Sequence, residues 1–197
     1  MTRLAPFCLL ACMTLSGAPS SIPGVPRFVR VDDRVARGGQ PTAEGLRNLA
    51  AAGFRTIVDL RGKDERWKDE KKLAEALGIK YVNVPMQGMH TPHDRQIARA
   101  LKALADERAG PVFVHCKRGA DRTGVVIACY RMEHDGWSNR EALQEARDLG
   151  MYWYQFPLQR YIQSYRPQGD RNSVVEGAEG VVDGLKRLPS AVGDIFK

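Results

Sequence analysis

Short apolar runs alternate along the chain with longer segments whose apolar residues recur every three or four positions. The runs at residues 54–60, 79–84 and 111–114 contain β-branched or aromatic side chains, and each follows a glycine, which predicts buried strands. The periodic segments predict helices that begin at Pro41, at Asp64 and after Pro92.

The second of these helices carries many charges, which we interpret as a solvated face. Its buried side is predicted to consist of Trp67, Leu73, Ala74 and Leu77. Earlier in the chain, residues 28–31 alternate like an edge strand and residues 35–41 predict a turn. Near the end, Ser138 and Glu141 form a capping box that predicts the start of a helix. Gly150 ends that helix, and residues 158–165 mark a last one.

Strands that alternate with helices predict a single α/β domain with a mainly parallel central sheet flanked by helices. In such sheets ligands bind beyond the carboxyl ends of the strands. We expect this domain to span residues 28–166. Residues 19–27 are rich in Ser, Pro and Gly and are interpreted as a tether. From residue 167 to 197 the pattern weakens, which predicts a weakly ordered tail.

The first 18 residues combine one positive charge with a short apolar run, which is typical of an export signal. Two maturation routes compete: lipidation of Cys12, which would tether the protein to a membrane, and ordinary signal cleavage after Ala18. We therefore expect an exported protein, either periplasmic or a membrane-anchored bacterial lipoprotein. A cytosolic protein with a frayed apolar leader is the alternative. The apolar run is too short to span a bilayer.

Apolar residues make up 43% of the chain and charged residues 27%, as in soluble globular proteins. The formal net charge of +7 favours anionic ligands. Nucleic acid is a competing partner class, but the basic residues are spread along the chain without a nucleic-acid motif, so we expect none. We also expect a monomer. Cys8 and Cys12 belong to the leader, and Cys129 is interpreted as a small core residue.

Residues 115–124, with the sequence HCKRGADRTG, carry the chemistry. They lie between a predicted strand and a predicted helix, so the backbone N–H groups of the loop can surround a tetrahedral oxyanion. Arg122 can bind two oxygens of that anion, and the same donors favour a thiolate on Cys116. Gly119 allows the loop to bend, and Thr123 can bond Cys116 or assist a water molecule. A buried structural cysteine beside a surface ion pair is the alternative.

This segment resembles the signature of the protein tyrosine and dual-specificity phosphatase superfamily. The resemblance implies that Cys116 attacks phosphorus, that Arg122 holds the equatorial oxygens, and that water hydrolyses a phosphocysteine intermediate without a metal or cofactor. The implied phosphate-binding residues are Lys117, Arg118, Gly119, Ala120, Asp121 and Arg122. Further stretches at residues 28–32, 37–41 and 56–61 resemble the atypical plant and fungal dual-specificity phosphatases and their bacterial relatives, some of which cleave inositol pyrophosphates.

The general acid departs from the superfamily pattern, because Gly88 stands where an aspartate is expected. Asp121 is our first choice for the acid, with an orienting salt bridge as its alternative role. Other candidates near the equivalent loop are His90, His93 and Asp94. A phosphate leaving group has a low pKa and needs less help from an acid.

We therefore predict a cysteine-dependent phosphatase that acts on a phosphorylated protein or a small polyanion. Lys117 and Arg118 would favour multiply charged substrates, and His115 is expected to support the loop. Two other classes remain open: a phosphate-binding module without turnover, and a sulfurtransferase, which also places a reactive cysteine in an anion-binding loop.

Overall fold

The computed structural model describes residues 20–62 and 67–168. Its sheet has the strand order β1-β2-β5-β3-β4. The strands are β1 (Val29–Arg30), β2 (Val35–Gly38), β3 (Thr56–Asp59), β4 (Lys80–Asn83) and β5 (Val112–His115). Only β1 runs antiparallel to its neighbour, β2, whereas β2, β3, β4 and β5 pair in parallel. The predicted α/β domain with a mainly parallel sheet is confirmed.

Strand β2 corrects the sequence-based prediction of a turn at residues 35–41. Val35 and Ala36 are fully buried, and β2 pairs in register with β5 from Val35 opposite Val112 to Gly38 opposite His115. The turn begins only at Gly39, because glycine and proline residues follow the strand. This correction matters for the site, since β2 runs beside the strand that delivers Cys116.

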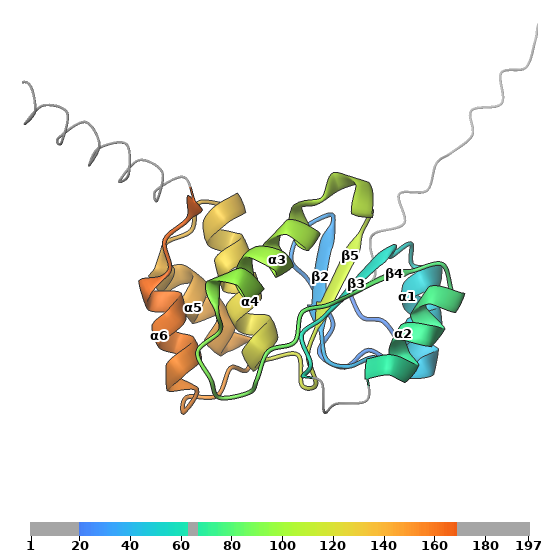
Figure 1. Cartoon of the computed structure of the whole chain (residues 1–197), viewed down its shortest axis with the longest axis horizontal. Coiled ribbons are helices and arrows are strands. Elements are labelled where there is room, and N and C mark those ends of the chain that lie inside the picture. Colours follow the sequence, from blue (N-terminus) through green and yellow to red (C-terminus); the bar gives the residue numbers. More distant parts are fainter. Residues whose placement is uncertain (1–19, 63–66, 169–197) are drawn as a thin grey trace, which may run out of the picture.

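Helices cover both faces of the sheet (Figure 1). On one side lie α1 (Ala43–Ala51) and α2 (Trp67–Ala76). The other side carries α3 (Asp94–Ala105), α4 (Asp121–His134), α5 (Asn139–Asp148) and α6 (Phe156–Ser164), and a short 3₁₀ turn η1 (Glu107–Ala109) precedes β5. Each side has its own apolar core. Cys129, a residue of α4, is fully buried in the core, as predicted.

Local signals set several helix boundaries. The Thr42 hydroxyl accepts a hydrogen bond from the Gly45 N–H and caps α1. Ser138 and Glu141 form the predicted capping box of α5. Gly78 and Gly150 have positive φ angles of 74° and 95° just after α2 and α5, where side-chain-bearing residues are disfavoured.

Residues 20–27 pack onto the domain, unlike the tether predicted for residues 19–27. Ile22 and Val25 are buried in the core beside α1. The Gly24 carbonyl accepts a hydrogen bond from the Thr42 N–H, and the Asn48 side chain donates to the Pro23 carbonyl. Two apolar residues within a Pro- and Gly-rich stretch are enough to anchor it. The packed domain therefore begins before Phe28.

The predicted export signal, and the C-terminal tail from residue 169 onward, lie outside the described residues. Within the described residues no helix is both long and apolar enough to span a bilayer.

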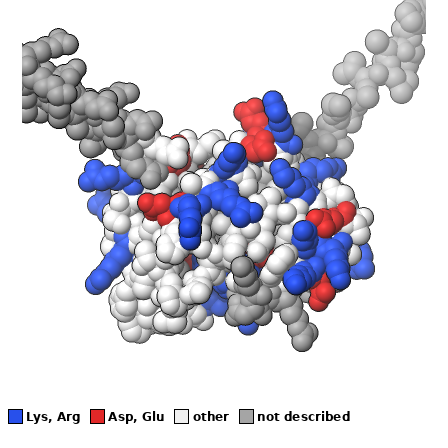
Figure 2. All heavy atoms as spheres, viewed as in Figure 1, with Lys and Arg blue, Asp and Glu red and all other residues white. Residues whose placement is uncertain are grey.

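The face drawn in Figure 2 carries separate groups of Lys and Arg side chains among fewer acidic ones.

Candidate active site

The site is built around residues 116–120, which connect β5 to α4 and which we call the Cys116 loop. Cys116 is almost completely buried. Its sulfur accepts a hydrogen bond of 3.2 Å from the Gly119 N–H. Helix α4 begins directly after the loop, at Asp121, so its positive N-terminal end is close to the sulfur. Both features are suited to holding an anion beside the sulfur.

Strand β2 supports the Cys116 loop through direct backbone contacts. Gly119 has a φ of 79°, and a Cβ atom there would lie 2.3 Å from the Gly38 carbonyl carbon, so a side chain is excluded. The Gln40 N–H donates to the Lys117 carbonyl. Arg37, itself buried, donates to the Gly119 carbonyl at 2.8 Å. Burial lowers the pKa of Arg37 to about 10, which still leaves the side chain charged at neutral pH.

Arg122 lies at the carboxyl edge of the sheet, beside the residues that follow β3 and β4. Its Nη1 atom donates to the Met86 carbonyl at 3.2 Å and to the Leu60 carbonyl at 3.4 Å. Leu60 is adjacent to the loop, because its N–H donates to the His115 carbonyl at 2.9 Å. The guanidinium is thus held by the segments that leave β3 and β4, on the side of the sheet where the Cys116 loop opens.

Asp121 is engaged by protein groups through both carboxylate oxygens. Oδ2 accepts from Arg118 at 3.0 Å, and Oδ1 accepts from the Tyr152 N–H at 3.0 Å. Burial raises the pKa of Asp121, although the positive charges of Arg118 and Arg122 oppose this. These contacts match the orienting salt bridge that was the alternative to a general acid.

The remaining predicted residues of the signature occupy different environments. Lys117 is exposed at the rim, whereas Ala120 is fully buried. Thr123 is also fully buried, and its hydroxyl has no hydrogen-bond partner among the described residues. The Thr123 side chain is therefore enclosed at the start of α4.

A buried charge cluster, formed by Asp59, Arg61, Glu70, Tyr81 and His115, lies directly behind Cys116. Arg61 donates to both oxygens of Asp59, at 2.9 and 3.0 Å, and pairs with Glu70 at 2.8 Å. The Tyr81 hydroxyl donates to Asp59 at 2.7 Å. Burial opposes ionisation of Asp59, but the bonds from Arg61 and Tyr81 and the charge of His115 outweigh it, so the Asp59 pKa is lowered.

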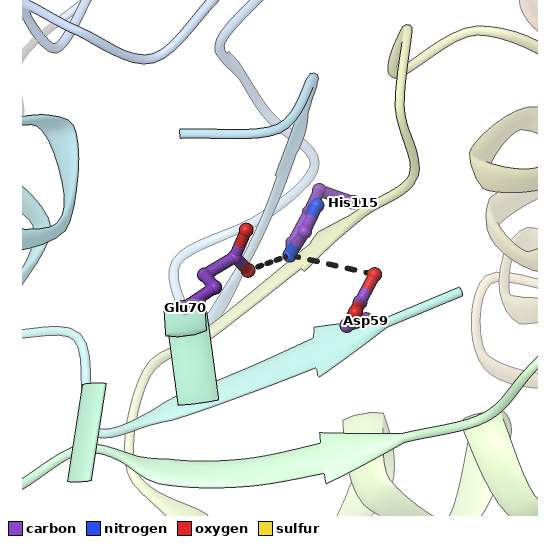
Figure 3. Close-up of side chains that lie close together, drawn as sticks. All are labelled: Asp59, Glu70 and His115. Carbon is purple, nitrogen blue, oxygen red and sulfur yellow. Dashed lines mark ion pairs between the residues drawn. The ribbon is translucent and has the colours of Figure 1, made fainter. Parts of the chain in front are cut away.

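His115 connects this cluster to the nucleophile. Its Nε2 atom is 2.8 Å from a Glu70 oxygen, and its Nδ1 atom is 3.2 Å from the Cys116 carbonyl oxygen. Figure 3 shows the imidazole between Glu70 and Asp59, with Nε2 directed at both carboxylates. His115 therefore supports the loop, as predicted. Sequence reasoning missed Glu70, because it treated the charges of α2 as solvated.

Asp59, Glu70 and His115 offer three potential metal ligands within 4.8 Å of one another. However, the Arg61 guanidinium already pairs with both carboxylates. A cation would have to enter beside a buried, permanently charged arginine, which is electrostatically unfavourable. We therefore interpret this group as an ion-pair cluster and assign no metal site to it.

The segment that precedes α3 lines a cavity of about 1040 Å³ beside Gly62. No carboxylate lines this cavity within the described part of the chain. His90 and His93 both line it, and the His90 ring contacts the Gly88 carbonyl. Asp94 instead accepts a hydrogen bond from the Tyr161 hydroxyl at 2.8 Å.

Comparison with known proteins places this geometry in a family. The family model described as a DSP-PTPase phosphatase fused to NAD+ kinase matches residues 28–154. The chain belongs to this DSP-type phosphatase family. Inositol diphosphatase DSP3 of Arabidopsis thaliana is 31% identical to this phosphatase over 144 residues, which cover 70% of the chain and 69% of that protein. Dual specificity protein phosphatase TpbA of Pseudomonas aeruginosa is 29% identical over 167 residues, which cover 84% and 67%.

Solved structures show that this phosphatase shares their fold. The catalytic domain of the PP-IP phosphatase Siw14 from S. cerevisiae matches with a TM-score of 0.67 at 23% identity, covering 80% of the chain and 96% of that domain. TpbA in complex with phosphotyrosine matches with a TM-score of 0.65 at 24% identity, covering 82% and 99%. The predicted membership of the superfamily is confirmed, and the chain is a cysteine-dependent phosphatase.

Proposed function

We propose that this phosphatase hydrolyses phosphate monoesters through a phosphocysteine intermediate on Cys116. The observation that carries the proposal is the Cys116 sulfur, held by the Gly119 N–H at the N-terminus of α4. A phosphate placed there meets the Cys116 sulfur, the N–H groups of the loop and, at the same edge of the sheet, Arg122. Such a preformed set of donors suits phosphoryl transfer, in which charge spreads over three oxygens.

The reaction has two displacement steps. In the first, the Cys116 sulfur forms a bond to phosphorus while the bond to the leaving oxygen breaks and that oxygen takes up a proton from water. In the second, a water oxygen bonds to phosphorus, the sulfur–phosphorus bond breaks, and the thiolate and inorganic phosphate are released. Arg122 and the backbone N–H groups of residues 117–122 hold the phosphoryl oxygens throughout.

For Asp121, the two protein hydrogen bonds favour an orienting role over the predicted role as general acid. Asp121→Asn distinguishes the two roles. If Asp121 orients Arg118 and the Tyr152 backbone, the variant should lose a similar factor in kcat for good and poor leaving groups. A loss confined to poor leaving groups would instead show that Asp121 delivers the proton.

The function is tested by phosphate release from para-nitrophenyl phosphate, phosphotyrosyl and phosphoseryl peptides, inositol phosphates and pyrophosphate. We expect Cys116→Ser to lower kcat by at least roughly 10³-fold, as for removal of other enzymatic nucleophiles. Acid quenching should trap a phosphoenzyme in the wild type and none in Cys116→Ser. A wild-type protein that binds phosphate but never releases it would show a non-catalytic module, and thiocyanate formation from thiosulfate would show a sulfurtransferase.

We also propose that the protein is exported, on the basis of its first 18 residues. Its substrates would then be phosphoproteins or other phosphates of the cell envelope. Cell fractionation combined with N-terminal mass spectrometry tests this proposal. Lipidated Cys12 or a mature N-terminus after Ala18 would support export, and an intact leader in the cytosol would contradict it.

A further inference from the structure

Four aromatic side chains cluster on the surface, three in the loop between α5 and α6 and one at the first position of α6. Tyr152, Trp153, Tyr154 and Phe156 are 42%, 75%, 37% and 55% exposed. Their rings contact one another, with centroid distances of 4.8 Å for Tyr152–Tyr154, 5.7 Å for Trp153–Tyr154 and 6.0 Å for Trp153–Phe156. We call these four residues the aromatic surface. A contiguous exposed apolar patch of this kind marks an interaction site more often than a chance arrangement does.

The aromatic surface is held on a fixed backbone. The buried Gln159 side chain donates to the carbonyls of Tyr152 and Trp153, at 3.1 and 2.9 Å. The Tyr152 N–H donates to Asp121. A partner would therefore meet aromatic rings whose backbone is already ordered, which lowers the entropic cost of binding.

The aromatic surface adjoins the Cys116 loop. The Arg118 guanidinium lies 3.4 Å from the centroid of the Tyr152 ring, and it also donates to the Gly150 carbonyl and to Asp121. If a substrate group attached to a phosphate in the Cys116 loop extends toward the aromatic surface, it therefore passes over Arg118 and Tyr152.

Beyond Tyr152, a cavity of about 410 Å³ opens beside Trp153 and Phe156. Its polar lining includes Arg147 and Arg160, both on exposed positions of α5 and α6. Arg147 donates to the Gln159 side-chain oxygen. Within residues 20–62 and 67–168, neither arginine forms an ion pair with a carboxylate. The cavity thus combines aromatic walls with positive charge.

We propose that the aromatic surface and this cavity bind the polypeptide around the phosphorylated residue of a protein substrate. An apolar side chain of that polypeptide fits beside Trp153 and Phe156, and an acidic side chain pairs with Arg147 or Arg160. Trp, Tyr and Arg are also the residue types that contribute most to protein–protein binding energy. The inference rests on the proposed phosphatase function, and it assigns the site to phosphoproteins rather than to small inositol phosphates.

The shape of the region favours a peptide over the other occupants. A membrane-binding surface inserts its apolar side chains into the lipid interface, whereas Trp153 and Phe156 line a cavity together with glutamine and arginine side chains. An inositol polyphosphate requires cations around the whole ligand, and four aromatic rings would not bind its phosphate groups.

The test compares full-length variants on three substrates: para-nitrophenyl phosphate, a phosphotyrosyl peptide with Leu and Glu next to the phosphotyrosine, and the same peptide with Ser and Lys there. We expect the wild type to prefer the Leu/Glu peptide, mainly through KM. Trp153→Ala should lower kcat/KM for this peptide roughly tenfold to thirtyfold, the range of interface hot spots. The same variant should change the value for para-nitrophenyl phosphate less than about twofold, because a small substrate does not reach Trp153.

The double variant Arg147→Gln/Arg160→Gln should reduce the preference for the Leu/Glu peptide over the Ser/Lys peptide. Arg140→Gln is the matched control, since Arg140 is exposed on the same helix about 10 Å from Arg147 along the axis. Several outcomes would overturn the inference: equal use of both peptides, equal loss on all three substrates, or the same effect from Arg140→Gln. Trp153-dependent binding to vesicles of phosphatidylglycerol and phosphatidylethanolamine, or binding of the protein's own residues 169–197 to the surface, would do so as well. Failure to release phosphate from any substrate would instead contradict the proposed function.

Discussion

Behind the Cys116 loop the charged side chains are buried and paired with one another, whereas in front of it the charged and aromatic side chains face solvent. Asp59, Arg61 and His115 are at most 1% exposed. Lys117 and Trp153 are exposed. The back of the loop fixes the position of the nucleophile, and the front is free to meet different substrates.

This difference indicates that the two sides of the Cys116 loop have different roles. Buried pairs lose much stability when one partner is removed, because the other charge remains desolvated. Exposed pairs contribute little to stability, because water and salt screen them. Changes behind the loop should therefore act on folding, and changes in front should act on substrate choice.

Arg61→Leu should have the largest effect. It leaves Asp59 and Glu70 buried without their cation, and the expected loss in the free energy of unfolding is about 3–5 kcal/mol. Urea denaturation followed by circular dichroism measures it. Arg47→Leu, at an exposed position of α1, serves as the control and should cost less than about 0.5 kcal/mol. Similar losses in both variants would contradict the importance of the buried charge cluster.

Gly119→Ala should act on both folding and activity. The added Cβ would collide with the Gly38 backbone at 2.3 Å while φ is 79°, and we expect a loss of roughly 2–4 kcal/mol. Gly136→Ala separates the steric collision from the cost of a positive φ. Gly136 has a φ of 69° and no atom within 4 Å of an added Cβ. It should cost only about 1 kcal/mol. Phosphatase activity should fall in Gly119→Ala alone.

Tyr81→Phe should reduce stability in a pH-dependent way. Tyr81 donates to Asp59, whose pKa is lowered in the folded state, so Asp59 stabilises the fold at neutral pH. This stabilisation is present above the unfolded pKa of about 3.9 and is lost as the pH falls through the lower folded pKa. We expect Tyr81→Phe to cost about 1.5–3 kcal/mol at pH 7, and less below pH 4.

Tyr161→Phe removes an exposed tyrosine–aspartate bond and is the control for this experiment. Its effect in urea denaturation at several pH values should stay below about 0.5 kcal/mol. A loss of unfolding free energy in Tyr81→Phe that increases as the pH falls would contradict the predicted pH dependence.

Arg118→Gln should have the smallest effect on stability, at most about 1 kcal/mol, because the side chain is partly exposed. Its effect should instead appear as a higher KM for anionic peptides, with thermal unfolding almost unchanged. A large loss of stability with normal KM would show that the front of the loop is as structural as the back.

Most of the fold could be predicted from the sequence, because the strands β3, β4 and β5 are short apolar runs between clear helical segments. Strand β2 could not, since Arg37 and two glycines mask its pairing. Arg37 is a buried polar residue inside a strand, and its partners are carbonyls more than 80 positions away, Gly119 and Ala120. Such long-range partners leave no local signal.

The nucleophile and the arginine could be predicted because the signature is contiguous. The residues that surround them could not, because they come from separate elements. Glu70 looks like one of many surface charges on α2 until the fold brings it to His115. Trp153 and Phe156 follow the predicted end of α5, and nothing local indicates that Arg118 stacks on the ring beside them.

The packing of residues 20–27 has a consequence for how the protein can mature. The Pro26 carbonyl accepts a hydrogen bond from the Gly39 N–H at 2.7 Å, and Gly39 lies against the Arg118 backbone. Residues 20–27, which we call the amino-terminal strap, are thus joined to the Cys116 loop through Gly39. Processing at Cys12 or after Ala18 would preserve this strap. A proteolytic cut after Pro26 would remove this support of the phosphate site, so that processing there would inactivate the enzyme.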